Sequence, residues 1–250
     1  MLIRLKTQEE IEGFAKAGRL AAQVMRMLVD AAKPNTTTKD LDQLARNACS
    51  DANATPTFLG YNGFPAAICT SLNKELVHGI PSNSRYLQYG DLLKIDLGVT
   101  LNGYIGDIAR TIVVGQELPN QLVFQCKLAL LRGIAAAKAG ADIGDIGAAI
   151  FDIGKCFGFK VVMNYGGHGI DRYVLHADPY VPNFKTQNFL RLRAGMVLAI
   201  EPMFIDAKTN NTTIADDGWT VLTDGPCVHF EHTIALSEIG EPRILTLEDK

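Results

Sequence analysis

The chain has 250 residues, a formal net charge of −3 and 47% hydrophobic residues. These values are typical of a globular protein, and they give no reason to expect nucleic acid or an anionic membrane as a partner. No apolar run approaches ~20 residues, so the sequence predicts no transmembrane helix. The first ten residues carry acids where a signal peptide has its apolar core, which predicts a cytoplasmic protein.

The first 53 residues are predicted to form two helices. Residues 7–10 read Thr-Gln-Glu-Glu, the pattern of a capping box, and residues 11–32 have helical spacing with many alanines. Pro34 ends this helix because proline cannot continue it. Thr38 is then predicted to cap a second helix over residues 39–53.

Strands are predicted to complete this half of the chain. Residues 57–72 are short apolar runs broken by glycine, asparagine and proline, which indicates strands and loops. Residues 92–97 and 105–114 are β-type runs. The dipeptide Asn-Gly at 102–103 lies between them and is the strongest short hairpin signal.

The second half repeats this order of helix, helix and strands. Its helical patterns span residues 121–138 and 143–157, and its strand-like runs span residues 159–164, 196–203, 218–222 and 230–237. The two halves, about 1–115 and 116–250, would merge their antiparallel sheets into one α+β domain, residues 1–250. Helices would cover one face of the merged sheet, and the other face would be open for a site.

The two halves also place acidic residues alike. Residues 90–96 read Gly-Asp-Leu-Leu-Lys-Ile-Asp and end on Asp96, whereas residues 195–201 read Gly-Met-Val-Leu-Ala-Ile-Glu and end on Glu201. A second acid follows each run, Asp107 in the first half and Glu231 in the second. A single acid would more often cap a turn or pair with a basic residue. Four acids at duplicated places indicate converging carboxylates, whose repulsion two divalent cations would cancel.

Three histidines are candidates for the same centre. His168 stands in Tyr-Gly-Gly-His-Gly-Ile, where the glycines would let the backbone turn sharply and bring the imidazole close to a metal. One nitrogen among oxygen ligands favours Mn, Fe or Co over a closed structural zinc site. His78 and His176 are loop histidines, each either a surface or core residue or a proton carrier near the metals.

His229 lies two residues before Glu231, and His232 follows it directly. A strand is predicted here, with both histidines expected on the face opposite Glu231. We therefore expect a structural role for both.

Together these motifs resemble the type I methionine aminopeptidases of bacterial kind, within the pita-bread fold of peptidase family M24 that also holds prolidase and creatinase. The matching segments follow in order along nearly the whole chain: residues 73–81, 94–98, 103–107, 167–170, 199–203, 217–220 and 230–233. The resemblance implies an α/β (α+β) fold of two pseudo-symmetric halves, each two helices and an antiparallel sheet, around a central dinuclear metal site.

The resemblance also assigns residue roles. Two divalent ions per chain, drawn from Co, Mn, Fe or Zn, would be held by Asp96, Asp107, His168, Glu201 and Glu231. Asp107 and Glu231 would bridge both ions, Asp96 would hold one ion alone, and His168 with Glu201 would hold the other. The catalytic residues would be His78, His176 and Glu201. The substrate pocket would be lined by Phe58, Tyr61, Phe64, Cys69, His78, Leu175, His176 and Trp219.

The implied reaction is removal of the N-terminal methionine from peptides and nascent proteins, with a small second residue preferred. A hydroxide that bridges the two metals would attack the scissile carbonyl, and Glu201 would move the proton of the attacking water. His176 and His78 would stabilise the oxyanion and the leaving amide. The resemblance further implies a monomer that acts near the ribosome and needs neither nucleic acid nor a membrane.

The chain departs from the family pattern in places. Asp171 stands where the family usually has glycine, and one extra residue precedes His176. Cys227 stands near a serine that helps to hold a monovalent cation in the family, so that ion is not predicted. Phe58 and Leu175 change the pocket lining and leave the preference for the second residue open. The alternatives are a proline-directed aminopeptidase, which usually has an additional N-terminal domain, and a non-catalytic binding protein of the same fold, which typically lacks metal ligands.

Overall fold

The computed structural model describes residues 3–116, 120–186 and 190–247. Within them lie four α-helices: α1 (Gln8–Ala31), α2 (Thr38–Asp51), α3 (Gln121–Ala136) and α4 (Ile143–Cys156). The strands are β1 (Thr55–Pro56), β2 (Cys69–Leu72), β3 (Leu92–Leu101), β4 (Tyr104–Val113), β5 (Lys160–Val161), β6 (Gly167–Asp171), β7 (Val174–Val181), β8 (Val197–Ile200), β9 (Met203–Ile205), β10 (Thr212–Ile214), β11 (Val221–Thr223), β12 (Cys227–His229), β13 (Glu231–Ala235) and β14 (Arg243–Ile244), with a 3₁₀ turn, η1, at Tyr61–Gly63. No helix of the described segments is long and apolar enough to cross a membrane.

The helices begin close to the predicted positions because their caps are local in sequence. The Thr7 hydroxyl accepts from the Glu10 backbone N–H while the Glu10 carboxylate accepts from the Thr7 N–H, which confirms the predicted capping box. The cap of α2 was predicted one residue late. Thr37, rather than Thr38, forms the reciprocal pair with Asp40.

The main sheet joins the two halves of the chain at its centre. Its strand order is β1-β3-β4-β13-β8-β6-β7, and its pairs are antiparallel. The predicted hairpin is confirmed: β3 and β4 pair along their whole length around Asn102 and Gly103, both of which have positive φ. β4 of the first half lies beside β13 of the second half. The predicted merging of two helix-helix-sheet halves is therefore the architecture of the sheet.

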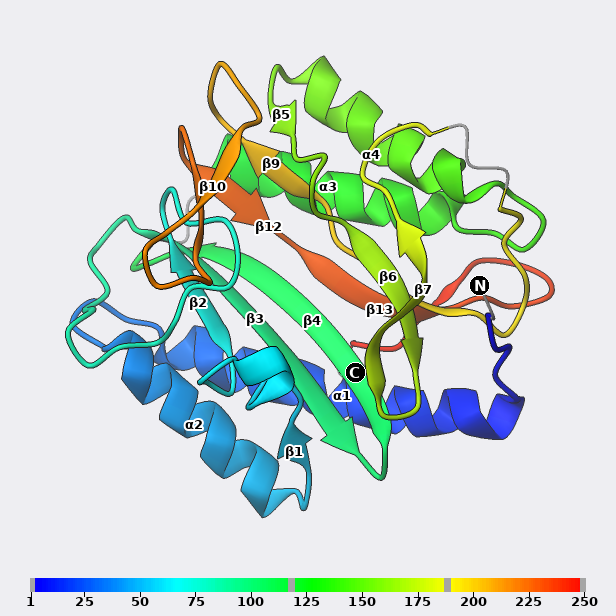
Figure 1. Ribbon diagram of the computed structural model, residues 1–250, viewed down its shortest axis with the longest axis horizontal. Helices are drawn as coiled ribbons and strands as arrows, with labels where there is room; N and C mark the ends of the chain where they lie inside the picture. Colours follow the sequence, from blue (N-terminus) through cyan, green and yellow to red (C-terminus); the bar gives the residue numbers. More distant parts are fainter. Residues whose placement is uncertain (1–2, 117–119, 187–189, 248–250) are drawn as a thin grey trace.

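Apolar side chains on alternate positions anchor the helices to this sheet. Ile95 and Leu97 of β3 pack in the core cluster beneath α1 and α2, while Leu198 and Ile200 of β8 pack in the cluster beneath α3 and α4. Figure 1 shows α1 and α2 beside the β3–β4 hairpin and α3 beside β9 and β12. Because strand side chains alternate between faces, Asp96 points away from the helices.

The strands of the second half differ from their predicted extents. The run predicted at 196–203 forms two strands, β8 and β9, which belong to different sheets. The strand conformation is interrupted at Glu201 and Pro202. The run predicted at 230–237 forms only β13. The run predicted at 159–164 is shortened to β5, and the run predicted at 218–222 is displaced to β11. Strand β10 and the β6–β7 hairpin were not predicted. Proline breaks and glycine-rich segments obscure the period-2 pattern on which strand prediction relies.

Candidate active site

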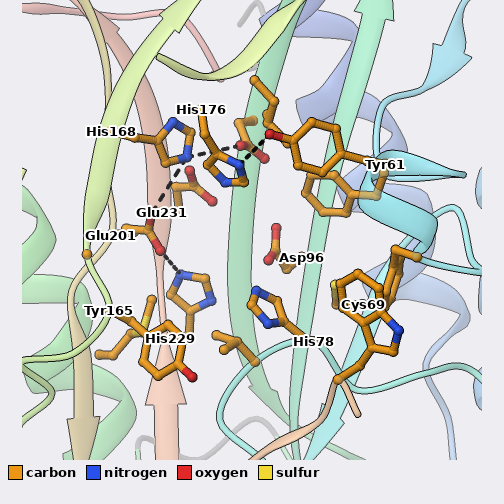
Figure 2. Close-up of a pocket in the computed structure, with 18 of the residues that line it drawn as sticks. Tyr61, Cys69, His78, Asp96, Tyr165, His168, His176, Glu201, His229 and Glu231 are labelled. Carbon is orange, nitrogen blue, oxygen red and sulfur yellow. Dashed lines mark hydrogen bonds and ion pairs between the residues drawn. The ribbon is translucent and has the colours of Figure 1, made fainter. Parts of the chain in front are cut away.

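Five neighbouring strands each supply one of the predicted metal ligands. In sheet order, β3 carries Asp96, β4 carries Asp107, β13 begins at Glu231, β8 is followed directly by Glu201, and β6 carries His168. The structure brings all five side chains to one cavity of about 240 Å³, on the face of the sheet away from the helices (Figure 2).

Strand register explains why the acids meet. Asp96 is paired with Ala109 on one side of β4, and Glu231 is paired with Ala109 on the other side. Paired residues in a sheet project to the same face, so the two carboxylates flank the small side chain of Ala109. Asp107 lies two residues before Ala109 and therefore shares this face. This register therefore places the carboxylates of Asp96, Asp107 and Glu231 on one face of the sheet, around the small side chain of Ala109.

These four acids lack a lysine or arginine partner in the described segments, and their pKa values are raised. Burial raises the pKa of Asp96 to about 7 and the pKa of Glu201 to about 8. Burial and the neighbouring acids raise the pKa of Asp107 and the pKa of Glu231 well above their usual range. No lysine or arginine in residues 3–116, 120–186 and 190–247 forms an ion pair with any of the four.

The arrangement fits divalent metal ions. Asp96 Oδ1, Asp107 Oδ1 and Glu231 Oε1 are buried without a hydrogen-bond partner, as expected of oxygens placed for a cation. Donor atoms of Asp107, His168 and Glu231 all lie within 4.8 Å of one another. His168 Nε2 also lies 3.7 Å from Glu201 Oε1, and burial lowers the pKa of His168 to about 3, so its imidazole is in the neutral, ligating form at pH 7.

The glycines beside His168 act differently from the prediction. Gly167 and Gly169 lie within strand β6, and neither is at a turn or has positive φ. A Cβ at Gly167 would lie 2.1 Å from the carbonyl oxygen of Ala199, and one at Gly169 would lie 2.1 Å from that of Asp178. Glycine is required at both positions because the backbone of β6 lies very close to its neighbouring strands.

His176 reaches the site despite the extra residue before it. The pairing of β6 with β7 shifts register between His168 and Gly169 and again before Asp171, so irregular pairing absorbs the additional residue. The rings of His168 and His176 consequently lie 4.3 Å apart. His176 Nδ1 and the Tyr61 hydroxyl are hydrogen-bonded at 2.9 Å, which fixes the orientation of the imidazole (Figure 2).

His78 faces the site from the loop after β2. Its backbone has a φ of 60°, a conformation that is uncommon for residues other than glycine. Its ring packs edge to face against Tyr165 at 6.2 Å, and burial lowers its pKa to about 4. Tyr165, which the sequence analysis did not select, comes just before the glycines that precede His168.

The apolar part of the cavity holds the remaining predicted residues. Phe58, Tyr61, Phe64, Cys69, Leu175 and Trp219 all line it. The rings of Phe64 and Trp219 pack edge to face at 5.2 Å. Cys69 is paired with Asp96 in the sheet, so the apolar end adjoins the carboxylates. Such a slot suits a flexible apolar side chain.

The prediction for His229 was wrong. His229 lines the cavity, and its Nε2 lies 3.3 Å from Glu201 Oε2. His229 lies two residues before Glu231, and side chains two residues apart along a strand share a face, so alternation places both at the cavity, with Phe230 between them in the core. His232, in contrast, pairs with the Thr246 hydroxyl at 2.8 Å, in agreement with a structural role.

Two of the departures from the family pattern lie outside the cavity lining. Asp171 accepts from the Arg4 guanidinium at 3.0 Å and lies 3.5 Å from the Lys6 ammonium, so it anchors the N-terminal segment. The Cys227 thiol bonds the carbonyl oxygen of Asn73 at 3.2 Å. Neither contact alters the five predicted ligands.

Comparison with known proteins agrees with this geometry. The model of metallopeptidase family M24 matches residues 12–238. A methionine aminopeptidase from Clostridium acetobutylicum is 43% identical over 98% of this chain and 99% of its own. The crystal structure of methionine aminopeptidase from Rickettsia prowazekii superposes with a TM-score of 0.94 at 37% identity, over 98% of this chain and 100% of that chain.

A prolidase from Pyrococcus furiosus shares the fold alone. Its TM-score is 0.76 at 24% identity, and the match covers 98% of this chain but only 66% of the prolidase. The fold of this protein is therefore the pita-bread fold common to both groups, whereas identity over nearly the full length is with one of them. The chain belongs to metallopeptidase family M24 and, within it, to the methionine aminopeptidases.

Proposed function

We propose that the protein removes N-terminal methionine from peptides and nascent proteins, with two divalent metal ions held by Asp96, Asp107, His168, Glu201 and Glu231. The observation that carries this proposal is the convergence of four carboxylates, three buried and that of Asp96 half-buried, unpaired with lysine or arginine in the described segments, beside an apolar slot. When bound, the metal ions supply Lewis acidity for the scissile carbonyl and lower the pKa of water.

The cavity explains how a substrate would be oriented. Tyr61, Phe64 and Trp219 would enclose the methionine side chain, with Cys69 at the base of the slot. Cys69 is paired with Asp96, so a residue seated in the slot has its α-amine next to the carboxylates. A free amine is favoured there because it can interact with the acidic centre. The protein would therefore be an exopeptidase.

Three side chains would manage protons and developing charge. Glu201 would move the proton of the attacking water, because its carboxylate lies at the cavity beside the other proposed ligands. His176, oriented by the Tyr61 hydroxyl, would donate to the oxyanion of the tetrahedral intermediate. His78 would contact the leaving amide from the opposite wall of the cavity.

A tripeptide assay tests this function. Protein freed of metal should be inactive, and Mn, Fe, Co or Zn should restore cleavage of Met-Ala-Ser, with the bound metal counted at two per chain. Cleavage of Ala-Pro-Ser but not Met-Ala-Ser would instead indicate a proline-directed peptidase. No cleavage of either peptide by metal-loaded protein would indicate a binding protein that has kept the ligands.

The setting of the reaction belongs to the same proposal. The substrates would be the N-termini of nascent proteins close to the ribosome, in the cytoplasm, and the protein would act as a monomer without nucleic acid or membrane. Sedimentation of the metal-loaded protein tests the monomer. Which of Co, Mn, Fe or Zn serves in the cell is tested by the metal content of protein purified without added metal.

A further inference from the structure

His229 is a buried imidazole that the proposed mechanism does not use. Its exposed fraction is 1%, and neither ring nitrogen has a hydrogen-bond partner within the described residues. Leaving a buried polar group without a partner destabilises the folded protein. The side chain nevertheless lies at the cavity wall, between Glu201, Tyr165 and His78 (Figure 2).

The backbone holds this ring in place from the neighbouring strand. The Thr111 hydroxyl accepts from the His229 N–H at 2.9 Å and donates to the His229 carbonyl oxygen at 2.7 Å. Thr111 lies on β4, so the end of β12 is fixed to the same strand that carries Asp107. This fixed position brings His229 Nε2 to 3.3 Å from Glu201 Oε2.

The two oxygens of Glu201 face different partners. Oε1 lies 3.7 Å from His168 Nε2, on the side of the other metal ligands, whereas Oε2 faces His229. The separation of His229 Nε2 and Glu201 Oε2 is already close to hydrogen-bond distance, so the pair lacks only alignment of the N–H with Oε2, which a small rotation of either side chain would supply. A carboxylate that binds a metal through one oxygen is commonly oriented by a hydrogen bond to the other.

We infer that His229 is a positioning residue for Glu201: its Nε2–H donates to Glu201 Oε2 and keeps Oε1 turned toward His168 and the metal site. An imidazole can carry a proton at Nε2 in its neutral or its charged form, so the role does not depend on titration. The inference rests on the proposed function, because it concerns the ligand and proton carrier of that reaction.

Two conservative variants distinguish this role from simple filling of space. The amide nitrogen of His229→Gln can occupy the Nε2 position, whereas that of His229→Asn reaches only the Nδ1 position. His232→Gln is the matched control, since the His232 side chain is hydrogen-bonded to the Thr246 hydroxyl and does not line the cavity. For each folded variant, we would measure Co²⁺ affinity by calorimetry, the visible absorption of the Co²⁺-loaded protein, and kcat and KM on Met-Ala-Ser.

The expected result separates the variants. His229→Asn should weaken Co²⁺ binding and lower kcat by about 10- to 100-fold each, with a changed absorption spectrum and nearly unchanged KM. His229→Gln should remain within about threefold of wild type, as should His232→Gln. Wild-type Co²⁺ affinity and spectrum in His229→Asn, or equal losses in Gln and Asn variants, would overturn the inference. Wild-type protein that neither binds Co²⁺ nor cleaves the peptide would instead overturn the proposed function.

Discussion

Removal of metal should make the stability of this protein fall as pH rises from 7 to 8. Burial raises the pKa of Glu201 to about 8, and burial with the neighbouring acids raises the pKa of Asp107 and of Glu231 well above their usual range. In the unfolded chain such groups titrate near pH 4. The folded, metal-free protein therefore binds more protons than the unfolded chain in this window, and linkage makes its stability decrease with pH.

The pH window follows from the other shifted groups. Burial lowers the pKa of all five histidines, so these residues act with the opposite sign, mainly below the unfolded value of about 6.5. Burial lowers the pKa of Lys94 to about 8, so its opposing effect sets in above pH 7 and is half complete at pH 8. Between pH 7 and 8 the carboxyl groups dominate.

The magnitude can be worked out for one group. Each carboxyl group that keeps its proton in the folded state lowers stability by about 1.4 kcal/mol per pH unit. For a chain of this size that corresponds to a fall in Tm of roughly 3–6 °C. Bound metal replaces the protons, so the loaded protein should have a higher Tm with little pH dependence. A metal concentration of 100 times Kd adds about 2.7 kcal/mol.

Thermal denaturation with and without chelator, at pH 7.0, 7.5 and 8.0, measures this effect. The Tm difference between loaded and chelated protein should widen as pH rises. Glu201→Gln should reduce the slope of the chelated protein, whereas Asp51→Asn, at an exposed position at the end of α2, should not. A chelated protein whose Tm is constant or rises across this window would refute the reasoning.

Three further outcomes are expected. Asp107→Ala should lower kcat/KM at least about 100-fold and release metal, because it removes a ligand proposed to bridge both ions, whereas His78→Ala should lower activity less and keep the metal. Unchanged metal content in Asp107→Ala would contradict the ligand assignment. Met-Ala-Ser should be cleaved much faster than Met-Leu-Ser, and N-terminal norleucine should be accepted far better than alanine, since one methylene in an apolar slot changes the barrier by only ~1–3 kcal/mol. Gly167→Ala should lower the unfolding free energy by ~1–3 kcal/mol in denaturant titration, because its Cβ would lie 2.1 Å from the Ala199 carbonyl oxygen; an unchanged midpoint would show that β6 can move.

The parts of the site that were predictable are those encoded by local pattern. Asp96 and Asp107 lie on a hairpin whose strands and Asn-Gly turn are visible in the sequence, and the structure pairs those strands in full. The convergence of Glu201 and Glu231 on the same cavity could be anticipated from the repeat of the first half. The closeness of His168 and His176 could not be predicted from the sequence. It depends on the irregular β6–β7 pairing, which absorbs the extra residue and has no local sequence pattern.

His229 was missed because it was treated as adjacent to Glu231, whereas it lies two residues before it and shares its face by alternation. The paired strand breaks near it were also not predicted. β8 and β9 are separated at Pro202, which lacks a backbone N–H, and β12 and β13 are separated at Phe230. The two breaks lie side by side: the Phe230 N–H donates to the Pro202 carbonyl oxygen at 3.3 Å, while β13 pairs with β8 and β12 pairs with β9. Both strands thus leave the main sheet at one level.

This paired crossing leaves the facing of the side chains unchanged. Val228 and Phe230 pack in the core, whereas His229 and Glu231 line the cavity. In the partner strand, Ile200 and Phe204 pack in the core and Glu201 lines the cavity. A period-2 pattern places His229 and Glu231, which are two residues apart, on the same face. Pro202 is the sequence signal for the break, and its effect on the partner strand becomes apparent only when the pairing of β8 with β13 is known.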